Sequence, residues 1–271
     1  MARVVIAITA ATFILFLPPR APSHSPDIQH YLYAANALIE HDDWLNKPGL
    51  GWVGYYYTER APLYPLILAA FQRAGLDAYT ASHGFNATLY GLLAYLLLGW
   101  AGRYKWLTAL LLFMPPLFFT FTATWAEPPT VLLTALFVHE FQQARPRRMG
   151  LYAAVALLLK YSAAPLVLFG FVWLLAVKGP RAAWRFVVWP VVAIAPWMLR
   201  NTLLVGSPFG LRLGAKYTWA YNAQVLGETL GLWIGLILIG VVVQWCVGLW
   251  WQRRSLSPSP PRLSSSRQAR A

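Results

Sequence analysis

Long apolar runs recur from one end of this chain to the other, and they constrain its fold more than any other feature. Apolar residues make up 58% of the 271 residues, and charged residues only 11%. A helix that crosses the hydrocarbon core of a membrane needs about 20 mostly apolar residues, because each residue rises about 1.5 Å. A soluble domain does not carry so many runs of this kind. We therefore interpret the chain as an all-α, polytopic membrane protein.

The runs indicate about eight spanning helices and one shorter segment. Six runs are long enough, or nearly so, to cross a membrane: 4–19, 80–100, 106–122, 128–143, 184–199 and 229–251. The stretch 150–177 carries Lys160 near its middle. A lysine at mid-bilayer is costly, so we divide this stretch into two short helices that meet at Lys160. The run 61–74 is short and contains two prolines, so we expect a short or re-entrant helix there.

Basic residues in the short connections predict which side of the membrane each connection occupies. They cluster at 103–105, 145–148, 178–185 and 253–254, and short loops rich in Lys and Arg stay in the cytoplasm. Only one acidic residue, Glu140, falls on that side in this assignment. The net charge of +13 therefore reflects membrane sidedness and does not indicate nucleic-acid binding. We expect a multi-pass protein of a bacterial inner (plasma) membrane, in contact with membrane lipids, whose opposite face is periplasmic or extracellular.

The remaining segments complete the predicted organisation. Residues 20–60 form a loop on the outer face, with an amphipathic helix at about 27–40 that is broken by the following Asn, Pro and Gly residues. Residues 252–271, rich in Ser, Pro and Arg, have the composition of a disordered cytoplasmic tail. The chain is thus predicted to consist of one transmembrane domain, 1–251, followed by this tail.

Two carboxylates reach the outer face in this topology. Asp27 opens the helix 27–40 and shares one helical face with Tyr31, although a carboxylate there also suits the first helical turn without any further role. Glu127 precedes two prolines, and it equally fits a solvated residue before a proline-started helix. The functional alternative is catalysis, because a carboxylate near a cation can take a proton from a hydroxyl group. Two carboxylates at one site can divide the acid and base roles.

Three cations reach the same predicted face. They are Arg60, Lys160 and Arg200, the last followed by Asn201. Each alone is best explained as an interfacial anchor whose charge reaches water. Together they would stabilise a phosphate group.

The five histidines show no spacing typical of a metal site, so we assign no metal ligand and no cofactor. A divalent metal near His24, Asp27 and His30, or near residues 41–43, is the less favoured alternative.

The order of these residues resembles a known family. Asp27 and Tyr31 are followed by Glu-Arg-Ala-Pro-Leu-Tyr-Pro-Leu at 59–66, and then by Glu-Pro at 127–128. Lys160 follows, and Pro-Trp-x-x-Arg-Asn at 196–201 ends the series. The set resembles the integral-membrane glycosyltransferases of the GT-C superfamily, in the ArnT-like and protein O-mannosyltransferase-like branch, which includes lipopolysaccharide sugar transferases. The resemblance covers about residues 1–215.

The resemblance implies a polyprenyl-phosphate sugar donor and direct, inverting transfer to a lipid, glycan or protein acceptor at the outer face. Asp27 then corresponds to the catalytic base, and Glu127 to a second acidic position. The residues implied in substrate binding are Tyr31, Arg60, Lys160, Arg200 and Asn201.

The chain departs from the family in having Asp-Ile at 27–28 where many relatives have Asp-Glu, and in being shorter. The alternative is a non-catalytic membrane protein, either a lipid-glycan transporter or a partner subunit. A transporter is expected to carry charges along a path through the bilayer and often internal repeats, whereas the notable charges here gather at one face.

Overall fold

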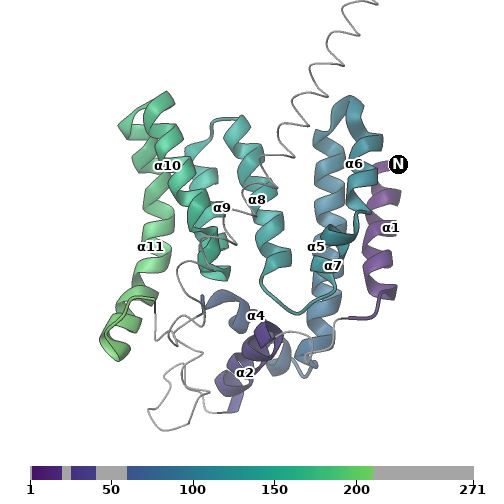
Figure 1. Cartoon of the computed structure of the whole chain (residues 1–271), viewed down its shortest axis with the longest axis horizontal. Helices are drawn as coiled ribbons and strands as arrows, with labels where there is room; N and C mark the ends of the chain where they lie inside the picture. Colours follow the sequence, from purple (N-terminus) through teal and green to yellow (C-terminus); the bar gives the residue numbers. More distant parts are fainter. Residues whose placement is uncertain (1, 20–25, 41–59, 210–271) are drawn as a thin grey trace, which may run out of the picture. The chain divides into compact units, whose positions relative to one another are not determined.

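The computed structural model describes residues 2–19, 26–40 and 60–209, and every regular element in these ranges is a helix. The α-helices are α1 (Ala2–Phe16), α2 (Pro26–Glu40), α4 (Leu63–Arg73), α5 (Ala78–Trp100), α6 (Lys105–Leu112), α7 (Pro115–Phe121), α8 (Glu127–Gln142), α9 (Pro146–Leu159), α10 (Ala164–Lys178) and α11 (Pro180–Val205). Short 3-10 turns occupy Gly102–Tyr104 and Tyr161–Ala163 (Figure 1). The predicted all-α class is confirmed for the described part of the chain.

Two described helices are long and apolar enough to cross a membrane, Tyr161–Lys178 and Pro180–Val205. A third candidate is the bent pair Gly102–Leu112 and Pro115–Phe121, if the two halves form one span. The structure therefore supports a membrane protein with two or three candidate spans. The larger count of eight stays a prediction, and the expected span 229–251 and tail 252–271 lie outside the described residues.

Two predicted interruptions are confirmed. The helix over 150–177 breaks at Lys160, whose backbone is extended (φ −157°, ψ 127°) between α9 and the following 3-10 turn. The short run 61–74 forms α4, which has only 11 residues. The amphipathic helix expected at 27–40 is α2, and its buried residues Tyr31, Ala34 and Leu38 lie on one face as predicted.

Two predicted helices differ from the structure, one in being bent and one in where it ends. The run 106–122 is not one straight helix, because α6 and α7 are bent by 70° on either side of Met114. Pro115 follows Met114, and the residue before a proline avoids helical geometry. The last described helix runs past the predicted end at 199 to Val205. It ends at Gly206, whose φ of 72° is a left-handed cap that glycine adopts without strain.

Contacts between helix ends show the direction in which each helix runs. Arg3, near the start of α1, lies beside Gly99 at the end of α5, so these helices are antiparallel. Trp100, the last residue of α5, stacks on His139 near the end of α8, with ring centroids 4.2 Å apart, so these two helix ends lie together. Gly150, near the start of α9, lies against Phe186, near the start of α11, so α9 and α11 pack on each other and run parallel, and α10, which connects them in sequence, runs in the opposite direction (Figure 1). Three of the basic connections predicted to share one side, 103–105, 145–148 and 178–185, therefore lie at one set of helix ends, and the fourth, 253–254, falls outside the described residues.

A polar stripe on α5 supports the broken backbone of its neighbours. The Tyr90 hydroxyl donates to the carbonyl of Leu112, where α6 ends, and the Asn86 amide donates to the carbonyl of Ala123 at 2.8 Å. Ser82 Oγ lies 2.6 Å from Thr124 Oγ1. Freed carbonyls inside a membrane need such partners, because no water is present to satisfy them. The stripe thereby fixes the segment that leads into α8.

Asp77 caps the N-terminus of α5, and its removal gives the first testable prediction. Its Oδ2 accepts a hydrogen bond from the backbone N–H of Thr80 at 2.8 Å. This bond lowers the pKa of the Asp77 carboxyl below its ordinary value. Asp77→Ala is expected to cost about 1 kcal/mol of unfolding free energy at neutral pH, measured by thermal unfolding in detergent.

The pH dependence of this cap has a defined sign. Because the folded pKa is depressed, the stabilisation is present above the unfolded pKa of about 3.9 and disappears as the pH falls through the lower folded value. Asp77→Asn is the matched control, since asparagine caps a helix about equally well without ionising. A stability difference between wild type and Asp77→Ala that stays constant down to about pH 3 would contradict the assignment.

Candidate functional site

An ion pair joins two points at which the helices are interrupted, the start of α8 and the extended residue that follows α9. Lys160 Nζ donates to Glu127 Oε1, and the two side chains are 26% and 27% exposed. Glu127 is the first residue of α8, whose helix is started by Pro128 and Pro129. Lys160 occupies the extended residue between α9 and α10. Glu127 is therefore not a solvated turn residue, because it is held by a cation from a distant part of the sequence.

The second carboxylate oxygen of Glu127 is buried, and the buried side chain of Tyr64 lies near this carboxylate. Glu127 Oε2 is buried and accepts no hydrogen bond from any described residue. The buried side chain of Tyr64, from α4, lies close enough for the charge of Glu127 to oppose ionisation of its hydroxyl. Burial raises the pKa of the Tyr64 hydroxyl well above its ordinary value, and the nearby Tyr31 and Glu127 raise it further. Tyr64 therefore stays protonated at neutral pH, and its hydroxyl keeps a hydrogen that it can donate in a hydrogen bond.

Arg60 lies against α2. Its guanidinium carbon is 5.7 Å from the centroid of the Tyr31 ring, and its Nη2 is 3.2 Å from Nδ1 of His30. Tyr31 in turn packs edge-on against Tyr64, with ring centroids 5.0 Å apart. The cation is thus placed over the face of a buried aromatic ring, where the ring quadrupole attracts it.

Tyr161 connects Arg60 to the end of α11. Its hydroxyl accepts a hydrogen bond from Trp197 Nε1 at 2.7 Å and donates to the carbonyl of Arg60 at 3.4 Å. The Arg200 guanidinium lies 4.5 Å from the centroid of the Trp197 ring and donates to Asn201 Oδ1 at 3.0 Å. The buried Asn201 also donates to the carbonyl of Pro208, so the turn after α11 is tied to the same group.

The structure brings six of the seven predicted site residues into one connected group. These are Tyr31, Arg60, Glu127, Lys160, Arg200 and Asn201. Asp27 stands in the first turn of α2, four residues before Tyr31, so its Cα lies on the same side of the helix. The side chain of Asp27 lies outside the described part of the structure. Its catalytic role, like the roles of the others, stays a prediction.

Three further residues of the group were not among the seven predicted site residues. They are Tyr64, Tyr161 and Trp197. Each lies inside or beside a motif already recognised: 59–66, Lys160 and 196–201. The motifs therefore carried a signal for them, but tyrosines and tryptophans at membrane interfaces are common enough to conceal it.

A separate hollow of about 420 Å³ lies between the ends of α2 and α4 and the start of α5. Its lining includes Asn36, Glu40, Gln72 and Asp77, and none of the predicted site residues. Within the described ranges no three His, Cys, Asp or Glu side chains form a metal-binding group. His24 and residues 41–43 of the less favoured metal alternative lie outside those ranges, and His30 contacts Arg60.

Comparisons of the chain with protein families, with curated proteins and with solved structures found no match.

Proposed function

We propose that this protein is a membrane glycosyltransferase that moves a sugar from polyprenyl phosphate to a lipid, glycan or protein acceptor. The observation that supports this most is the connected group at one set of helix ends, in which Lys160 pairs with Glu127 and the next residue, Tyr161, contacts the carbonyl of Arg60. Arg200 joins the same group through Trp197. Isolated interfacial anchors have no reason to converge on one another, whereas a substrate phosphate gives them one.

The proposed reaction uses the cations to stabilise a growing negative charge. The acceptor oxygen attacks C1 of the sugar, and the bond between C1 and the phosphate oxygen breaks. The electron pair leaves with that oxygen, so the phosphate changes from a singly charged diester to a more highly charged monoester. Arg60, Lys160 and Arg200 neutralise this charge, and the acceptor proton passes to the carboxylate of Asp27. The polyprenyl tail lies among the apolar helices throughout.

The Glu127–Lys160 pair suggests how the charge of Lys160 is balanced before the donor binds. Glu127 offers Lys160 an anion in the position that we assign to the donor phosphate. When the phosphate takes the ammonium group, Glu127 is left beside the protonated Tyr64. Its carboxylate oxygens are then available to accept a hydrogen bond from the acceptor hydroxyl, so Glu127 is suited to orient that group or to share the base role.

The proposal extends to the architecture. We place about eight spanning helices and the short re-entrant α4 in a GT-C-like bundle in a bacterial inner membrane, with the group around Lys160 on the periplasmic face. The apolar surfaces of α10 and α11 and the basic residues at the opposite helix ends support this orientation.

Transfer of radiolabel tests the proposal. The purified full-length chain is given a panel of polyprenyl-phosphate sugars and membrane-derived acceptors, as wild type and as Asp27→Asn. Label is expected to move with wild type and to fall at least about a hundredfold with Asp27→Asn. Asp77→Asn, which changes an acid outside the group, is the control and is expected to transfer normally. Binding of polyprenyl phosphate without transfer from any donor would favour the partner-subunit alternative, and transfer unaffected by Asp27→Asn would remove the base assignment.

A further inference from the structure

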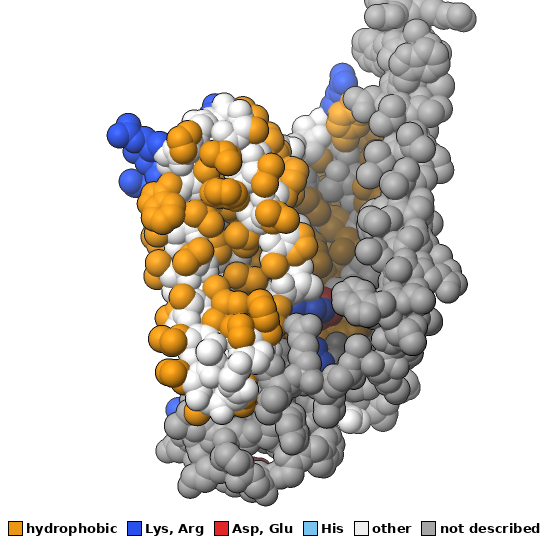
Figure 2. Space-filling view, turned by 60° about the vertical axis from the view of Figure 1, so that its left-hand side comes forward, with side chains coloured by type: hydrophobic (Ala, Val, Ile, Leu, Met, Phe, Trp, Pro, Cys, Tyr) orange, Lys and Arg blue, Asp and Glu red, His pale blue; other side chains and the backbone are white. Residues whose placement is uncertain are grey.

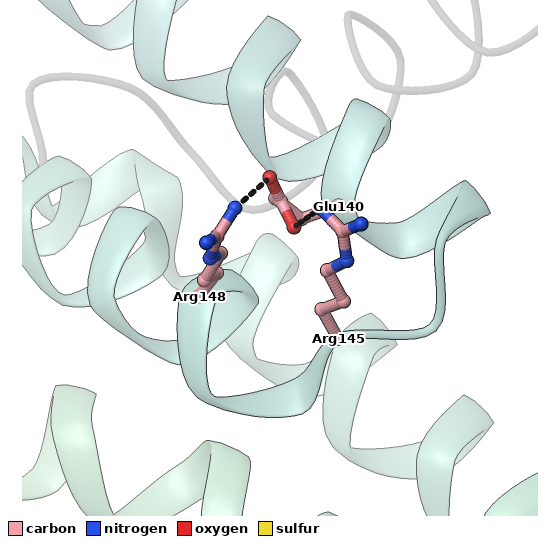
Figure 3. Close-up of polar contacts among 3 residues, drawn as sticks. All are labelled: Glu140, Arg145 and Arg148. Carbon is pink, nitrogen blue, oxygen red and sulfur yellow. Dashed lines mark hydrogen bonds and ion pairs between the residues drawn. The ribbon is translucent and has the colours of Figure 1, made fainter.

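At the opposite helix ends a buried carboxylate holds two arginines in place. Glu140, at the end of α8, is only 5% exposed. It accepts hydrogen bonds at 3.5 Å from Nη1 of Arg145 and at 3.5 Å from Nη1 of Arg148 (Figure 3). The side chains of these arginines are 49% and 62% exposed. Each guanidinium has five N–H donors, so most of them remain directed away from Glu140.

More cations gather around this pair. Because α9 and α11 run parallel and approach closely at Gly150, their first turns lie side by side. The sequence places Arg147 in the first turn of α9, Arg181 and Arg185 at the start of α11, and Lys178 at the end of α10, all of them exposed. The sequence contains no further Asp or Glu from residue 141 to residue 227. Glu140 is thus the one acid among the described residues of this strongly basic region.

An exposed apolar surface begins next to these cations. It covers the outward sides of the two candidate spans, α10 and α11, and Figure 2 shows it as a broad hydrophobic face with Lys and Arg side chains at its upper edge. Its members include Leu168, Val172, Leu175, Trp184, Trp189, Val191, Val192 and Leu199. Trp184 is 68% exposed within one turn of Arg181 and Arg185. Exposed tryptophan at the level of a basic cluster is typical of a helix at the headgroup region of a membrane.

We propose that these basic helix ends form a binding site for the headgroup of an anionic phospholipid. The arginines held by Glu140 and the cations of α10 and α11 bind the phosphate, and the acyl chains lie along the apolar face beside them. Arginine suits this task because its planar group offers paired N–H donors to phosphate oxygens. A nucleic acid or an acidic protein would match the charge, but the apolar face of two candidate spans puts lipid headgroups directly beside these cations. The proposal does not depend on the glycosyltransferase assignment.

Native mass spectrometry of the full-length chain tests this site. The protein is released from micelles that contain phosphatidylglycerol or phosphatidylcholine, and bound lipids are counted. We expect phosphatidylglycerol to be retained preferentially, and Arg181→Gln with Arg185→Gln to reduce its affinity about tenfold. These two arginines have no bond to Glu140, so the double variant keeps the α8–α9 connection intact. The charge-matched control is Arg103→Gln with Lys105→Gln, in the connection between α5 and α6.

Each of these comparisons has a result that would overturn the proposed lipid site. Equal retention of both lipids, or an equal loss in the control variant, would overturn a defined site in favour of diffuse charge attraction. Displacement of phosphatidylglycerol by millimolar inorganic phosphate would show a site for free anions instead. Glu140→Gln tests whether Glu140 positions the two arginines for lipid binding. We expect a reduced preference for phosphatidylglycerol in protein that remains folded. Lower thermal stability with an unchanged preference would make Glu140 a purely structural residue and would count against the arginine pair as the binding group.

Discussion

Lys160→Met is expected to lower sugar transfer by about a hundredfold to a thousandfold, the usual cost of removing one group that stabilises developing charge. Lys160 is the cation that reaches the carboxylate of Glu127, and the proposed donor phosphate competes for the same ammonium group. Methionine keeps the length and apolar bulk of the side chain but carries no charge. Steady-state measurement of kcat/KM for the donor, with protein whose thermal unfolding has been checked, gives the size of the effect.

A double variant separates catalysis from folding. Lys160→Met alone leaves Glu127, partly buried, without its cation, so some of its effect will be on stability. Lys160→Met with Glu127→Gln removes both charges and is expected to restore most of the unfolding free energy without restoring transfer. Transfer at the wild-type rate in this double variant would show that the pair is a structural tie with no part in the reaction.

Gly150→Ala is expected to destabilise the protein by about 3 kcal/mol, at the upper end of the range for overpacked cores. A Cβ atom on Gly150 would lie 2.4 Å from the backbone oxygen of Phe186 and 2.8 Å from the Trp189 ring. A backbone atom cannot swing aside as a flexible side chain does, so α9 and α11 must separate. Lys160 stands at the end of α9, and Trp197 lies in α11, so the separation also disturbs the group at the far end. Thermal unfolding in detergent measures the loss.

Gly84→Ala is the matched control for this packing prediction. Gly84 lies inside α5, and a Cβ added there meets nothing within 4 Å. Replacing a glycine inside a helix by alanine is expected to raise stability by about 0.5 to 1 kcal/mol. Similar melting temperatures for the two variants would mean that the close approach of α9 and α11 does not matter for stability.

Much of the helical layout follows from the sequence by simple physical arguments. Lys160 cannot remain at the centre of a bilayer helix, and the structure breaks the helix there. The prolines at 62 and 65 mark the start of the segment that becomes α4, where a missing backbone N–H costs nothing. The gathering of Arg60, Glu127 and Lys160 was expected from topology, because charge sidedness placed all three at one face.

Other features depend on neighbours that a local pattern does not identify. The bend at Met114 is compatible with a membrane because Tyr90, from a different helix, satisfies the carbonyl of Leu112 beside it, and Asn86 does the same for the carbonyl of Ala123 in the turn before α8. An apolar run gives no indication of such partners, so 106–122 looked continuous. The pairing of Glu127 with Lys160, and the bridge that Tyr161 makes between Arg60 and Trp197, also join distant residues. Sequence gives the candidates and their common face, whereas the partners come from packing.

Binding of a lipid-linked phosphate by Arg60, Lys160 and Arg200 is tested most directly by photoaffinity labelling. The full-length protein is irradiated with polyprenyl phosphate that carries a photoreactive group next to the phosphate, and the labelled peptides are sequenced. Label is expected in the peptides that contain Tyr161 and Trp197, with a strong decrease for Lys160→Met. Equal labelling of the same peptides by the corresponding polyprenol, which has no phosphate, would contradict the proposed site.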